Sequence, residues 1–116
     1  MQQAQSLTWE WQENNDKMTL RLNGELSRNT LLPLWQQRAV FFAAKNPATL
    51  QWDLAQVSRI DSAGFALLCD FIKHNQQLAP QTKQQLINFS DQLVTLADLY
   101  GLSAWIRQFI HPTEKD

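Results

Sequence analysis

Three short segments of the chain alternate apolar with polar residues, and this period of two constrains the fold more than any other feature. Their apolar members are Leu7, Trp9 and Trp11, then Met18, Leu20 and Leu22, then Leu50, Trp52 and Leu54. Such alternation is typical of β-strands that bury one face and leave the other in water. A sheet that is polar on one side carries its helices mainly on the other side, which argues against a doubly wound fold.

The first two of these strands form a predicted antiparallel hairpin. Only the turn-forming run Glu13-Asn14-Asn15-Asp16 separates them, and a connection this short suits neighbouring antiparallel strands. A fourth strand is predicted at Leu86–Phe89, although its alternation is less regular.

A first helix is predicted between the hairpin and the third strand. Thr30 is a capping residue type, and Pro33 suits the opening turn of a helix. Apolar residues follow at mostly helical spacing as far as Phe42, and Asn46-Pro47 then ends the segment.

Two more helices are predicted near the C-terminal end. One spans roughly Asp91 to Tyr100 and stops at Gly101, which suits the left-handed end of a helix. Its apolar face is formed by Leu93, Leu96, Ala97 and Tyr100. The other spans about residues 103–110, with Ser103 as candidate cap and an apolar stripe of Leu102, Trp105, Ile106, Phe109 and Ile110. This stripe either folds onto the domain or serves partner binding or self-association.

Chain length and element order together predict one domain. A chain of 116 residues buries enough surface for a single core. The predicted order is strand, strand, helix, strand, helix, strand, helix, helix, which we interpret as an α/β chain close to the α+β type. We expect a single domain over residues 1–116, with its core at about residues 7–102.

Charge and hydropathy argue against several classes of partner. The net charge is −1 and no basic run stands out, which disfavours binding to nucleic acid or to an anionic bilayer. No segment approaches the ~20 apolar residues that span a membrane. Met1–Ser6 lacks the pattern of a secretory signal, so we expect a cytoplasmic protein.

The residues that usually carry metal or thiol chemistry are sparse. Cys69 is the single cysteine and lies in an apolar run, which is typical of a small buried hydrophobe. His74 and His111 lie far apart, without ligands at metal-binding spacing. We therefore expect no metal, no cofactor and no catalytic residue.

The most informative stretch runs from Trp52 to Phe65. We expect a strand that ends in Asp53, a short loop, and a helix that runs from Asp61 or Ser62 to about Gln77. Ser62 would then lie at a helix N-terminus, where unpaired N–H groups and the helix dipole favour an acceptor or a phosphate. The simpler interpretation is that Ser62 is only an N-cap.

The predicted helix has apolar residues on more than one face. A core stripe is formed by Phe65, Leu68, Cys69 and Ile72. Ala63, Leu67 and Phe71 point elsewhere, so either neighbouring helices or a partner protein cover them. Gly64 permits close approach, either of the helix to the sheet or of a partner to the backbone.

Several motifs resemble those of STAS domains. Asp53 at a strand, followed by Ile60-Asp61-Ser62-Ala63-Gly64, is similar to the hallmark of that group, and Asn23-Gly24-Glu25-Leu26 matches its Gly-x-Leu. Three further segments resemble the narrower MlaB family: Leu31-Leu32-Pro33-Leu34-Trp35, Val57-Ser58-Arg59 and Leu96-Ala97-Asp98-Leu99-Tyr100. The resemblance covers about residues 7–102. It departs at Ser62 and Ala63, where such sequences often have Thr and Gly.

The resemblance implies a STAS fold, with a four-stranded mixed sheet and helices mainly on one face. It implies a non-catalytic regulatory subunit of a Gram-negative ABC transporter that moves phospholipids between membranes and maintains outer-membrane lipid asymmetry. The implied partner is the cytoplasmic ATPase MlaF, in a complex with the permease MlaE and the substrate-binding MlaD, which places the chain peripherally at the inner membrane. The implied partner-binding residues are Trp35, Asp61, Ser62, Ala63, Gly64, Leu67 and Phe71.

Two further expectations follow from the resemblance. We expect Trp35 to be partly exposed beside the N-terminus of the helix that Ser62 begins. ATP hydrolysis would belong to the partner, because the three glycines Gly24, Gly64 and Gly101 form no Walker loop.

Two other functions compete with this interpretation. The main alternative is an anti-sigma-factor antagonist in which phosphorylation of Ser62 adds about −1.5 to −2 charge and decides which partner is bound. An enzyme is less consistent with the sequence, because Asp53, Asp61 and Ser62 have no nearby His or Lys to complete a reactive site.

Overall fold

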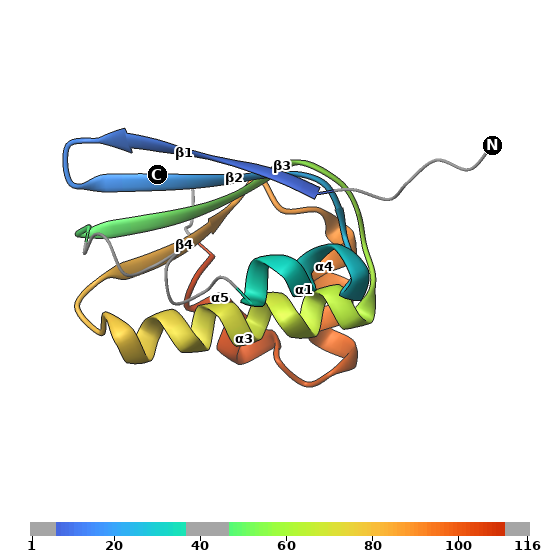
Figure 1. The fold of residues 1–116 in the computed structure, drawn as a ribbon. Helices are drawn as coiled ribbons and strands as arrows, with labels where there is room; N and C mark the ends of the chain where they lie inside the picture. Colours follow the sequence, from blue (N-terminus) through green and yellow to red (C-terminus); the bar gives the residue numbers. More distant parts are fainter. Residues whose placement is uncertain (1–6, 37–46, 111–116) are drawn as a thin grey trace.

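The structure is a computed structural model that describes residues 7–36 and 47–110 (Figure 1). Its elements are β1 (Leu7–Asn14), β2 (Lys17–Leu26), α1 (Arg28–Gln36), β3 (Thr49–Ile60), α3 (Ser62–Leu78), β4 (Lys83–Ile87), α4 (Asp91–Leu99) and α5 (Ser103–Arg107). The predicted order of strands and helices is confirmed. The part of the first helix predicted between Gln36 and Phe42 lies outside the described residues.

The four strands form one mixed sheet in the order β1-β2-β3-β4. β1 and β2 are antiparallel, whereas β3 is parallel to both β2 and β4. The predicted hairpin is confirmed, with Asn14 paired to Lys17 across a two-residue turn. Asn15 has φ 58° in this turn, a left-handed conformation that asparagine tolerates better than most residues.

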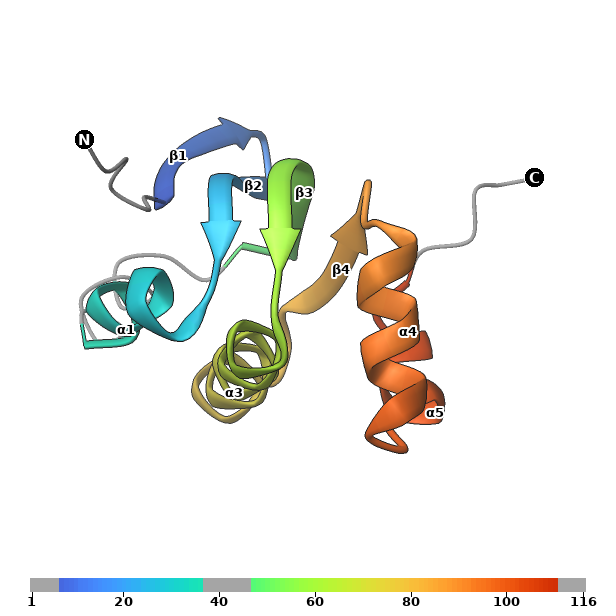
Figure 2. The same ribbon diagram turned by 90° about the vertical axis from the view of Figure 1, so that its right-hand side faces the viewer.

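The described helices lie on one side of the sheet (Figure 2). The core between the layers joins the inward strand residues to the α3 stripe, and it includes Leu20, Leu22, Trp52, Leu86, Phe65, Leu68 and Ile72. The opposite sheet face is polar, with Thr19 bonded to Gln51, and Gln51 bonded to Gln85. The alternation in the sequence therefore predicted both faces correctly.

The third strand is longer than predicted. The expectation that it ends at Asp53 is wrong, because β2 continues beside β3 until Leu26 pairs with Ile60. Two register shifts between β2 and β3, each with one extra residue in β3, accompany this extension. β4 behaves differently, since its pairing with β3 stops where Ile87 lies opposite Asp53.

The start of α1 also differs from the prediction. Ser27 precedes the helix, and its N–H donates to the Thr30 hydroxyl at 2.9 Å, while the Thr30 N–H donates to the Ser27 hydroxyl at 3.4 Å. This reciprocal arrangement resembles a capping box. The prediction that Thr30 itself is the cap is therefore wrong by one turn.

The helix predicted at roughly Asp91 to Tyr100 is α4, and its predicted apolar face is confirmed except at Tyr100. Gly101 has φ 69° just beyond α4, as expected of a helix stop. Leu93 and Ala97 are buried, whereas Tyr100 is 56% exposed, so its assignment to the buried face is wrong. The helix ends at Leu99, and Tyr100 follows it as the C-cap, with its ring stacked on that of Phe65.

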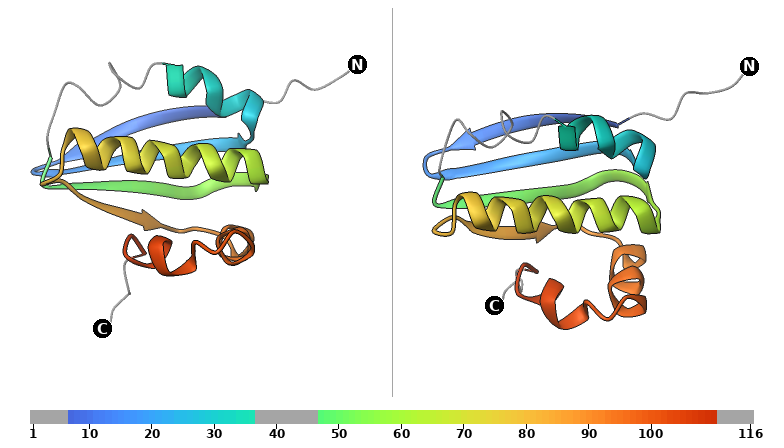
Figure 3. Two further views of the ribbon diagram at one scale, coloured as in Figure 1. Left: turned by 90° about the horizontal axis from the view of Figure 1, so that it is seen from below. Right: turned by 60° about the horizontal axis from the view of Figure 1, so that its bottom comes forward.

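The C-terminal segment folds back onto the β4 side of the domain (Figure 3). Its helix is short, and Ser103 is the first residue of α5 rather than its cap. Ile106 and Phe109 are buried, and the Leu86 N–H donates to the Phe109 carbonyl at 2.7 Å. The segment thus packs on the core and covers part of the β4 edge. A role in self-association stays a prediction.

Candidate partner-binding site

Asp61 and Ser62 begin α3 with distinct roles. Asp61 is the N-cap, with an extended backbone at φ −103°, and its Oδ1 accepts a hydrogen bond from the Gly64 N–H at 2.7 Å. Ser62 is therefore the first helical residue, and the interpretation of Ser62 as the cap is wrong. Its side chain is exposed, and its hydroxyl has no hydrogen-bond partner among the described residues.

Gly64 holds the start of α3 against the end of β2. A Cβ at this position would lie 2.1 Å from the Leu26 carbonyl oxygen and 2.9 Å from the Ser27 nitrogen. The Asp61 N–H also donates to the Leu26 carbonyl, at 3.2 Å. Of the two interpretations of Gly64, the structure supports the close approach of helix to sheet, since Gly64 is buried within the chain.

A hollow of about 330 Å³ opens beside the first two turns of α3. Its lining residues are Ser62, Ala63, Phe65 and Ala66 from α3, with Tyr100 and Leu102 from the turn between α4 and α5. Buried Phe65 forms the floor, and the Tyr100 ring stacks on it at 6.4 Å between centroids. Ala63 and Ala66 are exposed, and their small side chains leave the hollow open.

The exposed apolar surface continues beyond the hollow onto α4. Leu99 is 73% exposed and directly precedes Tyr100. Neighbouring exposed side chains of this size make the surface a candidate binding site. We call Ser62, Ala63, Phe65, Ala66, Tyr100 and Leu102 the docking surface.

Phe71 does not belong to this surface, which corrects the sequence prediction. Its side chain is 0% exposed, 5.2 Å from the Trp35 ring and 5.9 Å from the Trp52 ring. α1 and the sheet therefore bury Phe71. This agrees with the alternative that other elements of the chain, and not a partner protein, cover it. Leu67 is partly buried and packs against the core.

Trp35 is half-buried, as predicted, but in a different place. Its ring contacts the rings of Phe71 and His74, at 5.2 and 5.7 Å between centroids. Phe71 follows Ser62 by about 13 Å along the helix axis, at ~1.5 Å per residue. The expectation that Trp35 lies beside the N-terminus of α3 is therefore wrong, and it does not form one patch with Ser62.

Tyr100 and Ala66 were not among the residues predicted to bind a partner, and Leu102 was named only in the apolar stripe of the C-terminal segment. Tyr100 has the helical spacing of a core residue relative to Leu93 and Ala97, which concealed its exposure. The available signal was its position immediately before Gly101, where the helix ends. Ala66 gave no signal, because an alanine on a helix is equally common inside and outside.

The chemistry of the site is that of a binding surface. The docking surface offers two hydroxyls, those of Ser62 and Tyr100, and otherwise apolar side chains. Burial raises the pKa of the Cys69 thiol to about 11, so at neutral pH it is a protonated, unreactive core group. Within residues 7–36 and 47–110, no three His, Cys, Asp or Glu side chains are grouped as a metal site would need, and no helix is long and apolar enough to cross a membrane.

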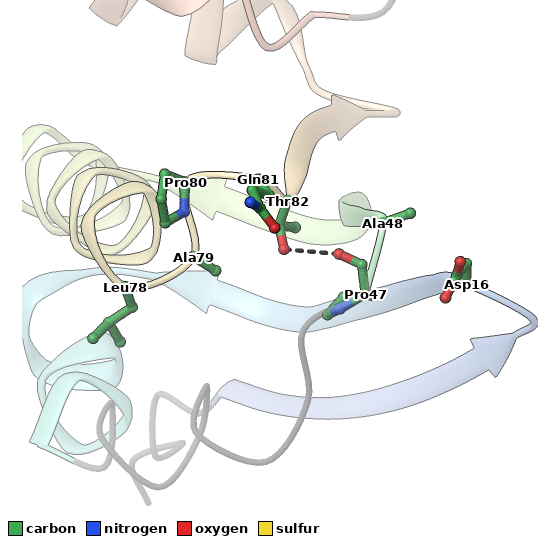
Figure 4. Close-up of a pocket in the computed structure, with 8 residues that line it drawn as sticks. All are labelled: Asp16, Pro47, Ala48, Leu78, Ala79, Pro80, Gln81 and Thr82. Carbon is green, nitrogen blue, oxygen red and sulfur yellow. Dashed lines mark hydrogen bonds between the residues drawn. The ribbon is translucent and has the colours of Figure 1, made fainter.

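A second hollow, of about 490 Å³, lies at the opposite end of α3 (Figure 4). It is lined by Asp16, Pro47, Ala48, Leu78, Ala79, Pro80, Gln81 and Thr82. The Thr82 hydroxyl closes one side by donating to the Pro47 carbonyl at 2.7 Å. None of the residues predicted from the sequence to bind a partner lines it.

The family model described as the MlaB STAS domain matches residues 9–108 of the chain. The chain belongs to this MlaB STAS domain family. It is 53% identical over 106 residues to the intermembrane phospholipid transport system binding protein MlaB of Haemophilus influenzae, covering 90% of this chain and 99% of that protein. The protein of the same name from Escherichia coli is 39% identical over 94 residues, covering 81% and 89%. The predicted family resemblance is confirmed.

Solved structures support the same fold. An anti-sigma factor antagonist from Mycobacterium paratuberculosis superposes with a TM-score of 0.72 at 20% identity, covering 92% of this chain and 86% of that one. The unphosphorylated anti-sigma factor antagonist SpoIIAA gives 0.58 at 24% identity, covering 84% of each chain. At these identities the likeness shows the fold alone, and the predicted STAS fold is confirmed.

Proposed function

We propose that this chain is a non-catalytic subunit of an ABC-type intermembrane phospholipid transporter, and that its docking surface binds the cytoplasmic ATPase MlaF. In this proposal MlaE and MlaD complete the complex, which maintains outer-membrane lipid asymmetry and holds the chain peripherally at the inner membrane. The names of its relatives give the transport system. The exposed hollow at the start of α3 supports the proposed position of the site.

The composition of the docking surface suits a protein partner. Tyr100 supplies an exposed aromatic side chain whose ring stacks on Phe65, and aromatic side chains are common energetic anchors at interfaces. Ala63 and Ala66 let a partner backbone approach α3 closely. Burial of this apolar surface would contribute about 25 cal/mol for each Å² removed from water.

The role of the subunit follows from linkage. ATP hydrolysis belongs to the partner in this proposal, and a bound subunit shifts the conformations of an ATPase only by binding one of them better. A subunit that prefers the hydrolysis-competent conformation activates the ATPase, and one that prefers any folded conformation stabilises it.

A phosphorylation switch at Ser62 is the second candidate function. Its support is the exposed Ser62 hydroxyl at the start of a helix, together with a fold shared with SpoIIAA, which has been solved in unphosphorylated and phosphorylated forms. A phosphate there would meet the positive end of the helix dipole. Intact-mass spectrometry of the native protein tests it, since a phosphorylated fraction is expected only under this alternative.

Ser62→Asp tests the docking proposal. Aspartate suits the first turn of a helix, and Asp61 continues to cap α3, so the melting temperature should stay close to that of the wild type. The new charge would have to lose its water when the docking surface is buried, so we expect binding to MlaF to weaken by at least ~10-fold. A pull-down or a titration with purified MlaF measures this.

Ser90→Asp is the matched control. Ser90 is exposed and precedes α4, so the substitution adds the same charge at another helix start outside the docking surface. Normal binding by both variants at matched stability would show that Ser62 is not at the interface.

A further inference from the structure

The docking surface is built from two parts of the chain that are distant in sequence. Four of its residues lie on the first two turns of α3, whereas Tyr100 and Leu102 follow α4. α4 lies on the β4 side of α3 (Figure 2). The shape of the hollow therefore depends on how α4 is oriented relative to the start of α3.

A hydrogen bond joins the first turn of α4 to the start of α3. The Ile60 N–H donates to the Gln92 Oε1 at 3.3 Å, and Ile60 directly precedes Asp61, the N-cap of α3. The next N–H along the chain, that of Asp61, donates to the Leu26 carbonyl at 3.2 Å. The start of α3 is thus fastened both to β2 and, through Gln92, to α4.

A second contact lies at the other end of α4. Tyr100 is the C-cap of this helix, and its ring stacks on the Phe65 ring at 6.4 Å between centroids. Gln92 precedes Tyr100 by about 12 Å along the helix axis, at ~1.5 Å per residue, so the two contacts together define the direction of α4. Buried Leu93 and Ala97 anchor α4 in the core, but apolar contacts are non-directional, whereas a hydrogen bond requires a narrow range of distance and angle.

We propose that Gln92 is a positioning residue of the docking surface, because its side-chain carbonyl orients α4 and so places Tyr100 beside the first turns of α3. Gln92 is exposed and does not line the hollow, so it acts on binding through the position of Tyr100. The inference rests on the proposed function and adds a residue that sets the shape of the surface.

Removing the acceptor tests this role. Gln92→Ala should lower the affinity for purified MlaF about 3- to 10-fold, the factor that one ordinary hydrogen bond is worth. The melting temperature should stay close to that of the wild type, because Gln92 is exposed and alanine favours a helix more than glutamine does. Gln77→Ala is the matched control, since Gln77 is exposed near the opposite end of α3 and outside the hollow. Its affinity should equal that of the wild type.

Gln92→Glu should rescue binding. A glutamate keeps an acceptor oxygen at the same reach, and its charge suits the first turn of a helix. We therefore expect this variant to bind MlaF like the wild type.

NMR spectra of the free protein give a measurement that does not depend on MlaF. In Gln92→Ala, the amide hydrogen of Ile60 should exchange faster with solvent, because it has lost its acceptor. If α4 also changes its orientation, the amide chemical shifts of Tyr100 and Leu102 should move. In Gln77→Ala the shifts of these residues should match those of the wild type.

The outcomes separate the inference from the proposed function. If Gln92→Ala binds MlaF like the wild type, or leaves the shifts of Tyr100 and Leu102 unchanged, Gln92 does not position the surface and the inference is wrong while ATPase docking stands. If Gln92→Glu binds as weakly as Gln92→Ala, the acceptor is not the cause and the inference is again wrong. If folded wild-type protein does not bind MlaF at all, the proposed function fails and the inference fails with it.

Discussion

At the scale of single residues, Asp53 shows how a polar side chain can be buried on an otherwise solvated sheet face. Its Oδ1 accepts the Ala55 N–H and the Asn88 side-chain amide, each at 3.0 Å, and its Oδ2 accepts Arg21 Nε at 3.2 Å. These partners come from β2, from β3 and from the loop after β4. Asp53 thus fastens the point where β3 and β4 separate, and holds Asn88 at φ 59° as the chain turns toward α4.

The charge of Asp53 should therefore contribute to stability. Burial raises the pKa of Asp53, but hydrogen bonds from Asn88, Ala55 and Arg21, with the charge of Arg21, outweigh burial and hold the pKa below its usual 3.8. We expect Asp53→Asn to lower the free energy of unfolding by about 2 to 3 kcal/mol at neutral pH, measured by urea titration. A carboxyl whose pKa is lower in the folded protein than in the unfolded chain stabilises the fold at pH values above the unfolded pKa. The difference in free energy of unfolding between the wild type and Asp53→Asn should therefore shrink as the pH falls below 3.8.

Glu10→Gln is the control for this prediction. Glu10 contacts the same Arg21 at 3.4 Å but its side chain is 62% exposed, so its loss should cost less than about 0.5 kcal/mol. Equal effects of the two substitutions would contradict the role given to Asp53.

At the scale of elements, the alternation predicted the first two strands well because each has one more buried and one more solvated face. It predicted β4 less well, at Leu86–Phe89 instead of Lys83–Ile87, because Gln84, Gln85 and Leu86 are all buried. The end of β3 could not be predicted in this way. Residues between Asp53 and Ile60 read as a loop, and only their pairing with the distant β2 makes them a strand. The position of Trp35 relative to α3 was predicted wrongly for a similar reason. Its neighbours on α3 depend on the direction in which α1 packs, which is a contact between segments distant in sequence.

The contact between α3 and β2 gives the prediction at this scale. Gly64→Ala should destabilise the fold by about 2 to 4 kcal/mol, because the new Cβ would overlap the Leu26 carbonyl and the helix would have to move. This occurs although alanine is the better helix former by ~1 kcal/mol. A Cβ at Gly101 would have no atom within 4 Å. Gly101→Ala should therefore lower the free energy of unfolding by only about 1 kcal/mol, because alanine is less favourable at a φ of 69°. Thermal melts rank the two, and the reverse order would show that α3 does not need its close approach to β2.

At the scale of the whole molecule, the structure separates residues that hold the fold from residues that offer a surface. The sequence grouped Trp35, Phe71 and Ser62 into one binding site, because family motifs show which positions matter and not what each one contacts. In the structure, Trp35 and Phe71 pack α1 onto α3, whereas Ser62 lies with Tyr100 at the other end of α3. Ser62 and Tyr100 are exposed, so a partner could cover them without disturbing the core, whereas Phe71 is buried and Trp35 is half-buried.

Trp35→Ala and Tyr100→Ala test this separation together. Trp35→Ala removes the ring packed on Phe71 and His74, and should lower the free energy of unfolding by about 2 to 3 kcal/mol. Tyr100 is 56% exposed, so Tyr100→Ala should cost less than about 1 kcal/mol while weakening MlaF binding by at least ~10-fold. Urea titrations and MlaF titrations of both proteins, at a temperature where both are folded, measure the two effects independently. If Trp35→Ala instead keeps its stability and loses binding, while Tyr100→Ala binds normally, the interface lies on the α1 side of α3 and the docking surface is wrongly placed.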